Sequence, residues 1–267
     1  MKNVLTIAGS DSSGGAGIQA DLKTFSAHGV FGMSVITAIT AQNTVGVSDI
    51  ENISSKMVAA QIKAVFEDID VHAVKIGMVS EIPIIETIAR ELIFYKAKNI
   101  VMDPVMISKS GTHLLKPEAK ETLIKTLLPV ATLVTPNILE AEAITGIKIK
   151  DHEDMKEAAY KIHSLGIQNV LVKGGHLDGD AADILYDGKN IKMFVTKRIN
   201  TKNTHGTGCT LSSAIAANLA KRLSLEEAIQ QAKTYMFTAI ENSFDLGKGV
   251  GPVHHFFNLY KKAGLLE

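Results

Sequence analysis

The sequence predicts an α/β protein with a doubly wound, mostly parallel sheet, helices on both faces and a small antiparallel element at one edge. Short apolar runs alternate with longer segments of helical period along the 267 residues. Apolar strands separated by helices form parallel sheets that are covered on both faces. Hydrophobic residues make up 46% of the chain, enough for a sizeable core. A late Asp-Gly turn between two β-rich runs indicates a hairpin.

The elements of the first half follow from apolar periodicity and glycine punctuation. Apolar or β-branched runs predict strands, and segments with apolar residues three and four apart predict helices. In one of these helices, Val58, Ile62, Val65 and Phe66 share a face. The expected strands are NVLTIAG, MSVITAITAQN, HAVKIGM and NIVMDPV, and the expected helices are AGIQADLKTFSAHG, SSKMVAAQIKAVFED and EIPIIETIARELIFY.

The second half continues the alternation and then departs from it. We expect a helix near residues 117–128, and strands at ATLVTPN and NVLVKGG that are flanked by helical segments. The segment ADILYDGKNIKMFVTKRIN predicts the antiparallel hairpin. Two helices follow, and Ser224 with Glu227 fits a capping box at the start of the second. No linker or internal repeat interrupts the pattern, so we expect residues 1–267 to form a single domain.

Composition narrows the class of function. Lys plus Arg and Asp plus Glu both total 28, so the formal net charge is zero. Binding to nucleic acid or to an anionic membrane needs a basic face, and we expect neither partner. The single cysteine cannot form an internal disulfide. The apolar runs are shorter than a signal-peptide core or a membrane span of roughly 18 residues. We therefore expect a cytoplasmic protein that acts on small molecules.

Polar signatures follow most of the predicted strands directly. They are GSDSSGGAG, KIGM, DPV, TPN, KGGH and HGTGC. In open α/β sheets, ligands bind in the crevice outside the carboxyl ends of the strands. These turns therefore predict one ligand site at one edge of the sheet. GSDSSGGAG lacks the G-x-G-x-x-G spacing of a dinucleotide fingerprint, which leaves a ligand loop and a simple tight turn equally open.

HGTGC is the strongest of these signatures. Its two glycines let the backbone approach a ligand, and the N–H groups of the following helix favour an anion such as phosphate. Cys209 lies in the first turn of that helix, where the pKa of a thiol typically falls from about 8.5 toward roughly 3.5–7.5. We therefore expect a reactive thiol rather than an inert buried one. His205 fits phosphate binding, catalysis or a structural role.

Other charged residues lie at the same predicted edge. Lys173 ends a strand before two glycines, so it is either a phosphate-binding cation or a solvated lysine. Asp103 and Glu140 are the carboxylates nearest the predicted crevice, and together they could hold Mg²⁺, which prefers few carboxylates, several waters and substrate phosphates. His254 and His255 are adjacent, which does not suit a zinc site.

These signatures, taken in order, resemble one kinase family. The chain is similar to the bacterial hydroxymethylpyrimidine/phosphomethylpyrimidine kinases, which have the ribokinase-like fold and act in thiamine biosynthesis. The resemblance covers residues from about 4 to 256. It rests on TIAGSDSSGGAGIQADLKT, AQNT, KIGM, DPVM, TPNILEA, VKGGH, NTKNTHGTGCTLSSA and GPVHHF. It implies ATP-dependent phosphorylation of 4-amino-5-hydroxymethyl-2-methylpyrimidine and then of its monophosphate.

The resemblance also implies roles for single residues. Gly206, Thr207 and Gly208 would form the anion hole for the transferring phosphate, and Cys209 would act as the general base. Lys173 would bind phosphate, and Asn137 would face the nucleotide. Asp103 and Glu140 would form the Mg²⁺ or phosphate neighbourhood. The pyrimidine would be bound by Asp21 and Gln42, in a pocket that Gly9 and Met78 line. The region AQNTVGVSDI would cover the substrate and join two subunits, so we expect a homodimer.

Two alternatives remain open. Pyridoxal and pyridoxine kinases share the fold and the cysteine turn, but those similar to this chain tend to carry HGAGCT and a methionine near AQNT. This chain has Thr207 and Gln42 at those places. A non-enzymatic regulator that binds a nucleotide or vitamer is the second alternative. Binding alone would not require Cys209, Lys173 and two acidic candidates together.

Overall fold

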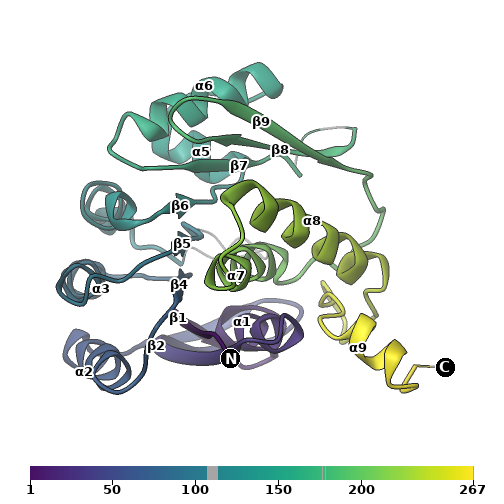
Figure 1. Ribbon diagram of the computed structural model, residues 1–267, viewed down its shortest axis with the longest axis horizontal. Coiled ribbons are helices and arrows are strands. Elements are labelled where there is room, and N and C mark those ends of the chain that lie inside the picture. The colour runs from purple at the N-terminus through teal and green to yellow at the C-terminus, as the bar shows by residue number, and fades with distance from the viewer. Residues whose placement is uncertain (107–113, 176, 178, 267) are drawn as a thin grey trace.

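The computed structural model describes residues 1–106, 114–175, 177 and 179–266. Its strands form one sheet of nine strands in the order β3-β2-β1-β4-β5-β6-β7-β8-β9 (Figure 1). The strands are β1 (Asn3–Asp11), β2 (Phe31–Gln42), β3 (Val47–Asn52), β4 (Ala73–Ile76), β5 (Ile100–Met102), β6 (Leu133–Val134), β7 (Val170–Lys173), β8 (Ala181–Tyr186) and β9 (Ile191–Thr196). His176, the last residue of the VKGGH signature, lies outside the described residues.

Helices cover both faces of the sheet, as the alternation of elements predicts. In Figure 1, α2 and α3 lie on one side of the sheet, and α1, α7 and α8 lie on the other. The α-helices are α1 (Gly17–Ala27), α2 (Ser55–Phe66), α3 (Ile82–Phe94), α4 (Lys120–Thr122), α5 (Ile138–Thr145), α6 (His152–His163), α7 (Thr207–Ala220), α8 (Leu225–Glu241) and α9 (Phe257–Lys262). Ser224 and Glu227 form the expected capping box of α8.

The centre of the sheet is parallel and both of its edges are antiparallel. Strands β2, β1, β4, β5, β6 and β7 pair in parallel. The expected hairpin is confirmed as β8 and β9, which extend the sheet beyond β7. The opposite edge adds a second antiparallel pair, because β3 pairs antiparallel with β2. The turn between them is closed by a hydrogen bond from the Asn43 N–H to the Gly46 carbonyl, 3.0 Å long.

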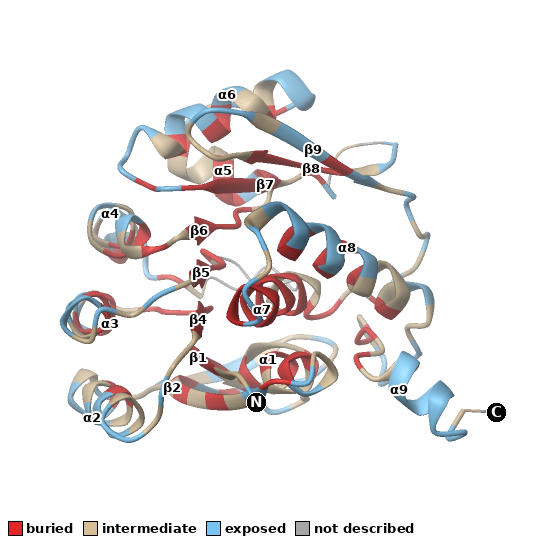
Figure 2. Cartoon of the chain, viewed as in Figure 1, coloured by how far each residue is buried: buried red, intermediate tan, exposed pale blue. Residues whose placement is uncertain are grey.

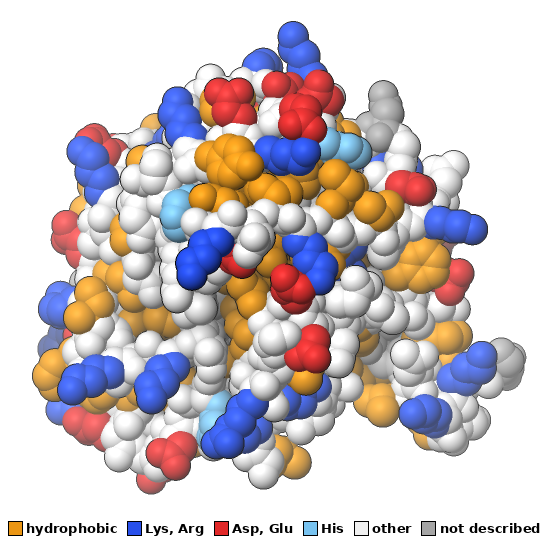
Figure 3. Space-filling model, turned by 45° about the horizontal axis from the view of Figure 1, so that its top comes forward, with side chains coloured by type: hydrophobic (Ala, Val, Ile, Leu, Met, Phe, Trp, Pro, Cys, Tyr) orange, Lys and Arg blue, Asp and Glu red, His pale blue; other side chains and the backbone are white. Residues whose placement is uncertain are grey.

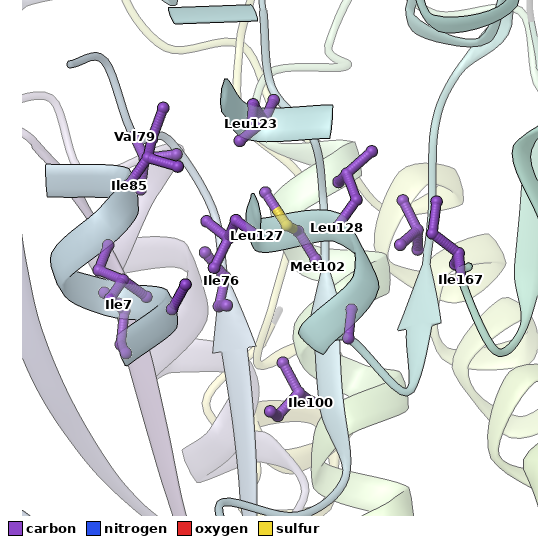
Figure 4. Packing of buried hydrophobic residues seen from close by; sticks show 14 of the residues in the cluster. Ile7, Ile76, Val79, Ile85, Ile100, Met102, Leu123, Leu127, Leu128 and Ile167 are labelled. Atoms are coloured by element: carbon purple, nitrogen blue, oxygen red, sulfur yellow. The ribbon is translucent and has the colours of Figure 1, made fainter. Parts of the chain in front are cut away.

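The helical region near residues 117–128 is less regular than expected. It is assembled from consecutive short segments, with a 3-10 turn at Pro117–Ala119, α4, a π turn at Leu123–Leu127 and a 3-10 turn at Leu128–Val130. Pro117 begins the first of these 3-10 turns, and Pro129 lies within the second. Proline has no backbone N–H to donate, which interrupts a regular helix. This region still packs Leu123, Leu127 and Leu128 into the core (Figure 4).

Helix α7 is the buried axis of the molecule. Every residue from Thr210 to Ala220 is buried, and Figure 2 shows the helix buried along most of its length. Its alanines let neighbouring helices approach closely, and α7 packs with Phe25 of α1 and Ile229 of α8 in one apolar cluster. The N-terminus of α7 is thereby held rigidly at the carboxyl edge of the sheet.

The surface shows no strong charge segregation on the face drawn in Figure 3, where acidic and basic side chains are interspersed. Among the helices of the described residues, none combines the length and the apolar character that a membrane crossing requires.

Candidate active site

A cavity of about 550 Å³ lies where the polar turns after the strands meet. It brings together all but one of the expected site residues, from segments far apart in the sequence. Those that line it are Gly9, Gln42, Met78, Asp103, Asn137, Glu140, Lys173, Gly206, Thr207, Gly208 and Cys209. The expectation that the turns share one site is therefore confirmed, although the role of each residue stays a prediction.

The HGTGC turn forms a backbone cradle at the start of α7. Gly206 is the N-cap in a left-handed conformation, with φ of 78°, and no side chain caps the helix. A Cβ on Gly206 would lie 1.8 Å from the Gly15 carbonyl oxygen, and a Cβ on Gly208 would lie 2.9 Å from Asp103 Oδ2. Gly206 is therefore required, and a side chain at position 208 would displace the Asp103 carboxylate. The N–H groups of a first helical turn have no intrahelical partner, which leaves them available to an anion in the cavity.

Lys173 and Asp103 face this cradle as a close ion pair. Lys173 Nζ lies 2.5 Å from Asp103 Oδ1, and a Cβ on Gly208 would lie 3.4 Å from the same Nζ. Burial lowers the pKa of Lys173, but the charges of Asp103 and Glu140 outweigh burial and raise it. Lys173 therefore keeps its positive charge at the cavity wall. Because its side chain is largely buried against Asp103, the alternative of a solvated lysine is excluded.

Asn137 and Glu140 cap α5 as well as lining the cavity. The Asn137 side chain accepts a hydrogen bond from the Glu140 N–H at 2.9 Å, and Glu140 Oε2 accepts one from the Asn137 N–H at 2.8 Å. This is a capping box, which the N-x-x-E spacing of TPNILEA indicates and which was not predicted. Burial is the main cause that raises the Glu140 pKa to about 7, with Asp103 adding to it and Lys173 opposing it.

The acidic pair fits Mg²⁺ only as part of a larger ligand set. Among the described residues, no group of three His, Cys, Asp or Glu side chains is arranged to hold a metal ion. Asp103 has one oxygen bound to Lys173, and Glu140 has one bound to the Asn137 backbone. Mg²⁺ keeps several waters and is commonly bound by one or two carboxylates together with substrate phosphates. The donors present are compatible with that mode and not with an all-protein cage.

The Cys209 thiol differs from the expectation in the direction of its pKa. Burial raises the pKa of this thiol from 9.0 to about 11, and the charges of Asp21 and Asp103 act in the same direction. Lys75 and the Gly17 backbone N–H oppose this rise without cancelling it. The predicted fall of the pKa is therefore wrong for the protein without ligands. Local helix position favours a thiolate, but the enclosed surroundings disfavour any unpaired negative charge.

Asp21 does not line the cavity, which corrects its expected contact with the pyrimidine. It has no exposed surface, and both of its carboxylate oxygens lie 2.8 Å from Lys75 Nζ. Thr6 and Ser213 also donate hydrogen bonds to it, at 2.6 and 2.7 Å. Its acceptor positions are thus used inside the protein. The sequence did contain one sign of this pairing. Lys75 is a lone lysine in the apolar run HAVKIGM, and a buried cation needs a buried carboxylate as its partner.

The glycine-rich loop after β1 lines the cavity and is tied to the HGTGC turn by His205. The Asp11 carboxylate accepts hydrogen bonds from the N–H groups of Gly15 and Ala16 and lies 2.9 Å from His205 Nε2. Burial alone would raise the Asp11 pKa, but hydrogen bonds from His205, Ser13 and Ala16, in that order of effect, lower it to about 2. His205 itself is buried. Of its possible roles, the structural one agrees with this placement.

Gln42 presents its amide to the cavity from the end of β2. Ser12 Oγ donates to its carbonyl at 2.7 Å and accepts from its N–H at 2.8 Å, so the backbone is clamped. The amide nitrogen lies 3.4 Å from His205 Nε2. That ring nitrogen carries the proton shared with Asp11, since a carboxylate only accepts, and it cannot also accept from Gln42. The amide donors of Gln42 are therefore available to a ligand.

Gly9 lets Met78 approach closely, because a Cβ there would lie 3.1 Å from the Met78 sulfur.

A third buried ion pair lines the cavity at its lysine end and was not predicted. Lys233 Nζ of α8 lies 2.7 Å from Asp183 Oδ2, and Asp183 Oδ1 accepts a hydrogen bond from the Gly174 N–H at 3.0 Å. Asp183 thereby fixes the turn that follows Lys173. Like Lys75, Asp183 is a charged residue within an apolar segment, here the β-rich run ADILY, and this position indicates a buried ion pair.

The sequence matches known proteins over nearly its whole length. Residues 11–254 match the family model for phosphomethylpyrimidine kinase. The hydroxymethylpyrimidine/phosphomethylpyrimidine kinase of Rhizobium meliloti is 54% identical over 261 residues, which cover 96% of this chain and 98% of the relative. The thiamine biosynthesis bifunctional protein of Geobacter sulfurreducens is 54% identical over 95% of this chain, which spans 52% of that longer protein.

Solved structures agree with the sequence matches. The phosphomethylpyrimidine kinase of Clostridium difficile 630 is 57% identical with a TM-score of 0.81, and the match covers 90% of this chain and 100% of that one. The ADP complex of Bacillus subtilis pyridoxal kinase is 43% identical with a TM-score of 0.90, and the match covers 96% of this chain and 98% of that one.

Proposed function

Because this chain belongs to the phosphomethylpyrimidine kinase family and has its ribokinase-like fold, we propose that it phosphorylates 4-amino-5-hydroxymethyl-2-methylpyrimidine with ATP. It then phosphorylates the monophosphate to the diphosphate, in thiamine biosynthesis. One observation carries the proposal. A single cavity is bordered by the uncapped N-terminus of α7, the Lys173–Asp103 pair and the amide donors of Gln42. These are an anion cradle, a phosphate cation and a group able to recognise an aminopyrimidine.

The phosphate end of the site works by positioning and charge neutralisation. Phosphoryl transfer passes through a loose transition state with charge spread over the oxygens of the transferred group. Backbone N–H groups at Gly208 and Cys209 would bind those oxygens. Lys173 would add a fixed positive charge, while Asn137 would face the nucleotide. Asp103 and Glu140 would hold Mg²⁺ through the phosphates and water, and the ion would neutralise charge on the phosphate oxygens.

Cys209 would receive the substrate hydroxyl beside this cradle. With a raised pKa the thiol is mostly protonated at neutral pH, so only its thiolate fraction would accept the proton of the substrate hydroxyl, becoming a neutral thiol. The transfer of that proton comes late in a loose mechanism, when the hydroxyl oxygen has already bonded to phosphorus. Proximity of the two reactants then supplies most of the rate.

Pyridoxal kinase activity is the second candidate, because the Bacillus subtilis structure similar to this one is named a pyridoxal kinase. Gln42 favours the pyrimidine. Its amide can donate to the ring nitrogen and accept from the exocyclic amine at once, whereas the substituents of pyridoxal cannot complete that pair. ADP release from the purified protein with ATP, Mg²⁺ and either vitamer tests the proposal. Faster turnover of pyridoxal than of the pyrimidine would overturn it.

The assembly would be a homodimer formed by the β2–β3 edge. Strand β3 is an edge strand, and Ile39 and Val45 at this edge are 51% and 64% exposed. Apolar side chains on an unpaired edge favour association. Light scattering coupled to size exclusion would give twice the mass of one chain, and Ile39→Lys would shift it toward the monomer. A wild-type monomer at micromolar concentration would exclude this assembly.

A further inference from the structure

We propose that the buried Asp21–Lys75 ion pair is a positioning element of the phosphotransfer site, which holds Cys209 and the first turn of α7 against α1 and β4. Its kinetic consequences rest on the function proposed above. Its effect on the Cys209 thiol is independent of any substrate.

Helices α1 and α7 pack against each other. The Gly17 backbone, at the start of α1, favours the Cys209 thiolate. Four residues later in each helix, Ser213 Oγ donates to Asp21 Oδ1 at 2.7 Å. Residues four apart lie on the same face of a helix. Asp21 therefore fixes the face of α7 on which Cys209 lies, one turn below the thiol.

Lys75 completes this arrangement from the sheet. It rises from β4 with no exposed surface, and its Nζ lies 2.8 Å from each Asp21 oxygen. Gly77 leaves space for the ammonium group, because a Cβ there would lie 2.7 Å from Nζ. Thr6 of β1 donates to Asp21 Oδ2 at 2.6 Å. Groups from α1, α7, β1 and β4 thus meet at one carboxylate.

The pair also sets part of the charge around the thiol. The charged groups whose fields reach Cys209 are Lys75 of β4, Asp21 of α1, Asp103 after β5 and Lys173 of β7. Of these, Lys75 has the strongest effect and favours the thiolate. Lys173 is paired with Asp103 at the cavity wall. The ammonium of Lys75 is therefore the cation that stabilises negative charge at Cys209 from the protein side.

Stability alone does not account for the pair. Replacing a buried ion pair by uncharged residues of similar volume is often neutral or even stabilising, whereas removal of one partner leaves an unpaired buried charge. The three side chains that donate to Asp21 come from β1, β4 and α7, so the carboxylate fixes the position of α7 relative to the sheet. We therefore assign the pair to positioning.

The test uses the fact that Cys209 is the only cysteine of the chain, so alkylation by iodoacetamide reports on this thiol alone. The double variant Asp21→Asn/Lys75→Met removes both charges together. We expect it to keep the wild-type circular dichroism and a melting temperature near wild type. Its alkylation rate at pH 8 should fall, because Lys75, which favours the thiolate, has a larger effect on the thiol than Asp21, which opposes it. Lys63→Met, which removes an exposed lysine of α2 paired only with Glu67 among the described residues, should leave the alkylation profile unchanged.

Kinetics separate positioning from a general loss of structure. Ser213→Ala removes one contact and keeps the ion pair, and it should lower kcat roughly tenfold or more while the KM for ATP changes little. Ser26→Ala is the matched control, because Ser26 Oγ donates to the Leu22 carbonyl of its own helix at an exposed position. If the double variant does not fold, the comparison of Ser213→Ala with Ser26→Ala decides. Equal kcat in these two, or a folded double variant with the wild-type alkylation profile, would overturn the proposal.

Failure of the proposed function would look different. If the wild-type protein phosphorylates neither vitamer, the alkylation profiles still test whether Lys75 and Asp21 control the thiol. If it phosphorylates the pyrimidine but the profiles coincide, the function stands and the positioning role does not.

Discussion

Lys173 Nζ and Asp103 Oδ1 are 2.5 Å apart although the residues are 70 positions apart in the chain. Lys173 ends β7 and Asp103 follows β5, and β6 separates these strands in the sheet. Because the three strands are parallel, their carboxyl ends bring both side chains to the same edge. Gly208 permits this pair to approach the start of α7. The result is a fixed positive charge beside an anion cradle.

Lys173→Met should raise the KM for ATP or lower kcat while pyrimidine binding stays nearly intact. The reason is that the variant removes the cation next to the cradle, which leaves phosphate charge uncompensated. Calorimetry with a non-hydrolysable ATP analogue and with the pyrimidine separates the two effects. Lys63→Met, which removes an exposed lysine of α2, is the control. Unchanged ATP affinity together with unchanged kcat would remove Lys173 from the site.

Gly206→Ala should abolish most activity, and Gly29→Ala should not. Both glycines have positive φ, 78° and 69°, so both variants carry the backbone strain of a left-handed alanine. A Cβ on Gly206 also meets the Gly15 carbonyl oxygen, whereas a Cβ on Gly29 meets nothing within 4 Å. The two variants share the backbone strain and differ in the contact of the added Cβ. Comparing their thermal unfolding and their kcat/KM therefore isolates the effect of that contact. Equal activities would show that the cradle tolerates displacement.

Cys209→Ala should fold normally and lose about 10²–10⁴-fold in kcat, the usual contribution of a general acid or base. In the wild type, the raised thiol pKa predicts that its contribution grows with pH from neutral toward about 11, as the thiolate fraction rises. The kcat ratio of wild type to Cys209→Ala, measured from pH 6.5 to 9.5, should therefore increase. A near-wild-type kcat with a lowered melting temperature would mean that the thiol only fills space.

Gln42→Met should shrink the preference for the pyrimidine over pyridoxal, chiefly by weakening turnover of the pyrimidine. An unsatisfied buried polar group costs about 1–3 kcal/mol, or roughly 5- to 150-fold in relative kcat/KM. The measurement is competition between the two vitamers at fixed ATP. Gln231→Met, at an exposed position of α8, is the control. An unchanged ratio would show that Gln42 does not recognise the ring.

Glu140→Gln should change how stability depends on pH. The folded-state pKa of Glu140 is raised from 4.5 to about 7, so its contribution is present below pH 4.5 and is lost as the pH rises through 7. Relative to Glu140→Gln, the wild type should therefore lose on the order of 1–3 kcal/mol of unfolding free energy across this interval. Urea unfolding at pH 4.5, 5.5, 6.5 and 7.5 provides the measurement.

Glu227→Gln supplies the matched control for Glu140→Gln. Glu227 occupies the same capping-box position in α8, but its hydrogen bonds with Ser224 lower its pKa. Its contribution is therefore lost as the pH falls, which is the opposite sign. The same pH trend in both variants would mean that the burial of Glu140 does not control its ionisation.

The sequence by itself determined the order of strands and helices and the turns that form the cavity. Apolar periodicity is a local property, so β1, β4, β5 and β7 and the glycines of HGTGC were readable one segment at a time. The rule that parallel strands present their carboxyl ends at one edge then placed Lys173 and Cys209 in one site, and the family resemblance added Gln42. The hairpin of β8 and β9 followed from its Asp-Gly turn.

Only the tertiary structure decided the partners of the charged residues. Asp21 is paired with Lys75, 54 positions away, because β4 lies beside β1, and neither segment shows this locally. The thiol pKa rises because α1, α7 and the sheet enclose Cys209, while its place in a helix favours the opposite. His205 is bonded to Asp11 because the fold brings the loop after β1 beside the turn before α7, which the local sequence does not show. Charges interact through space and desolvation depends on all neighbours, so a pattern along the chain shows where a charged group lies but not what it faces.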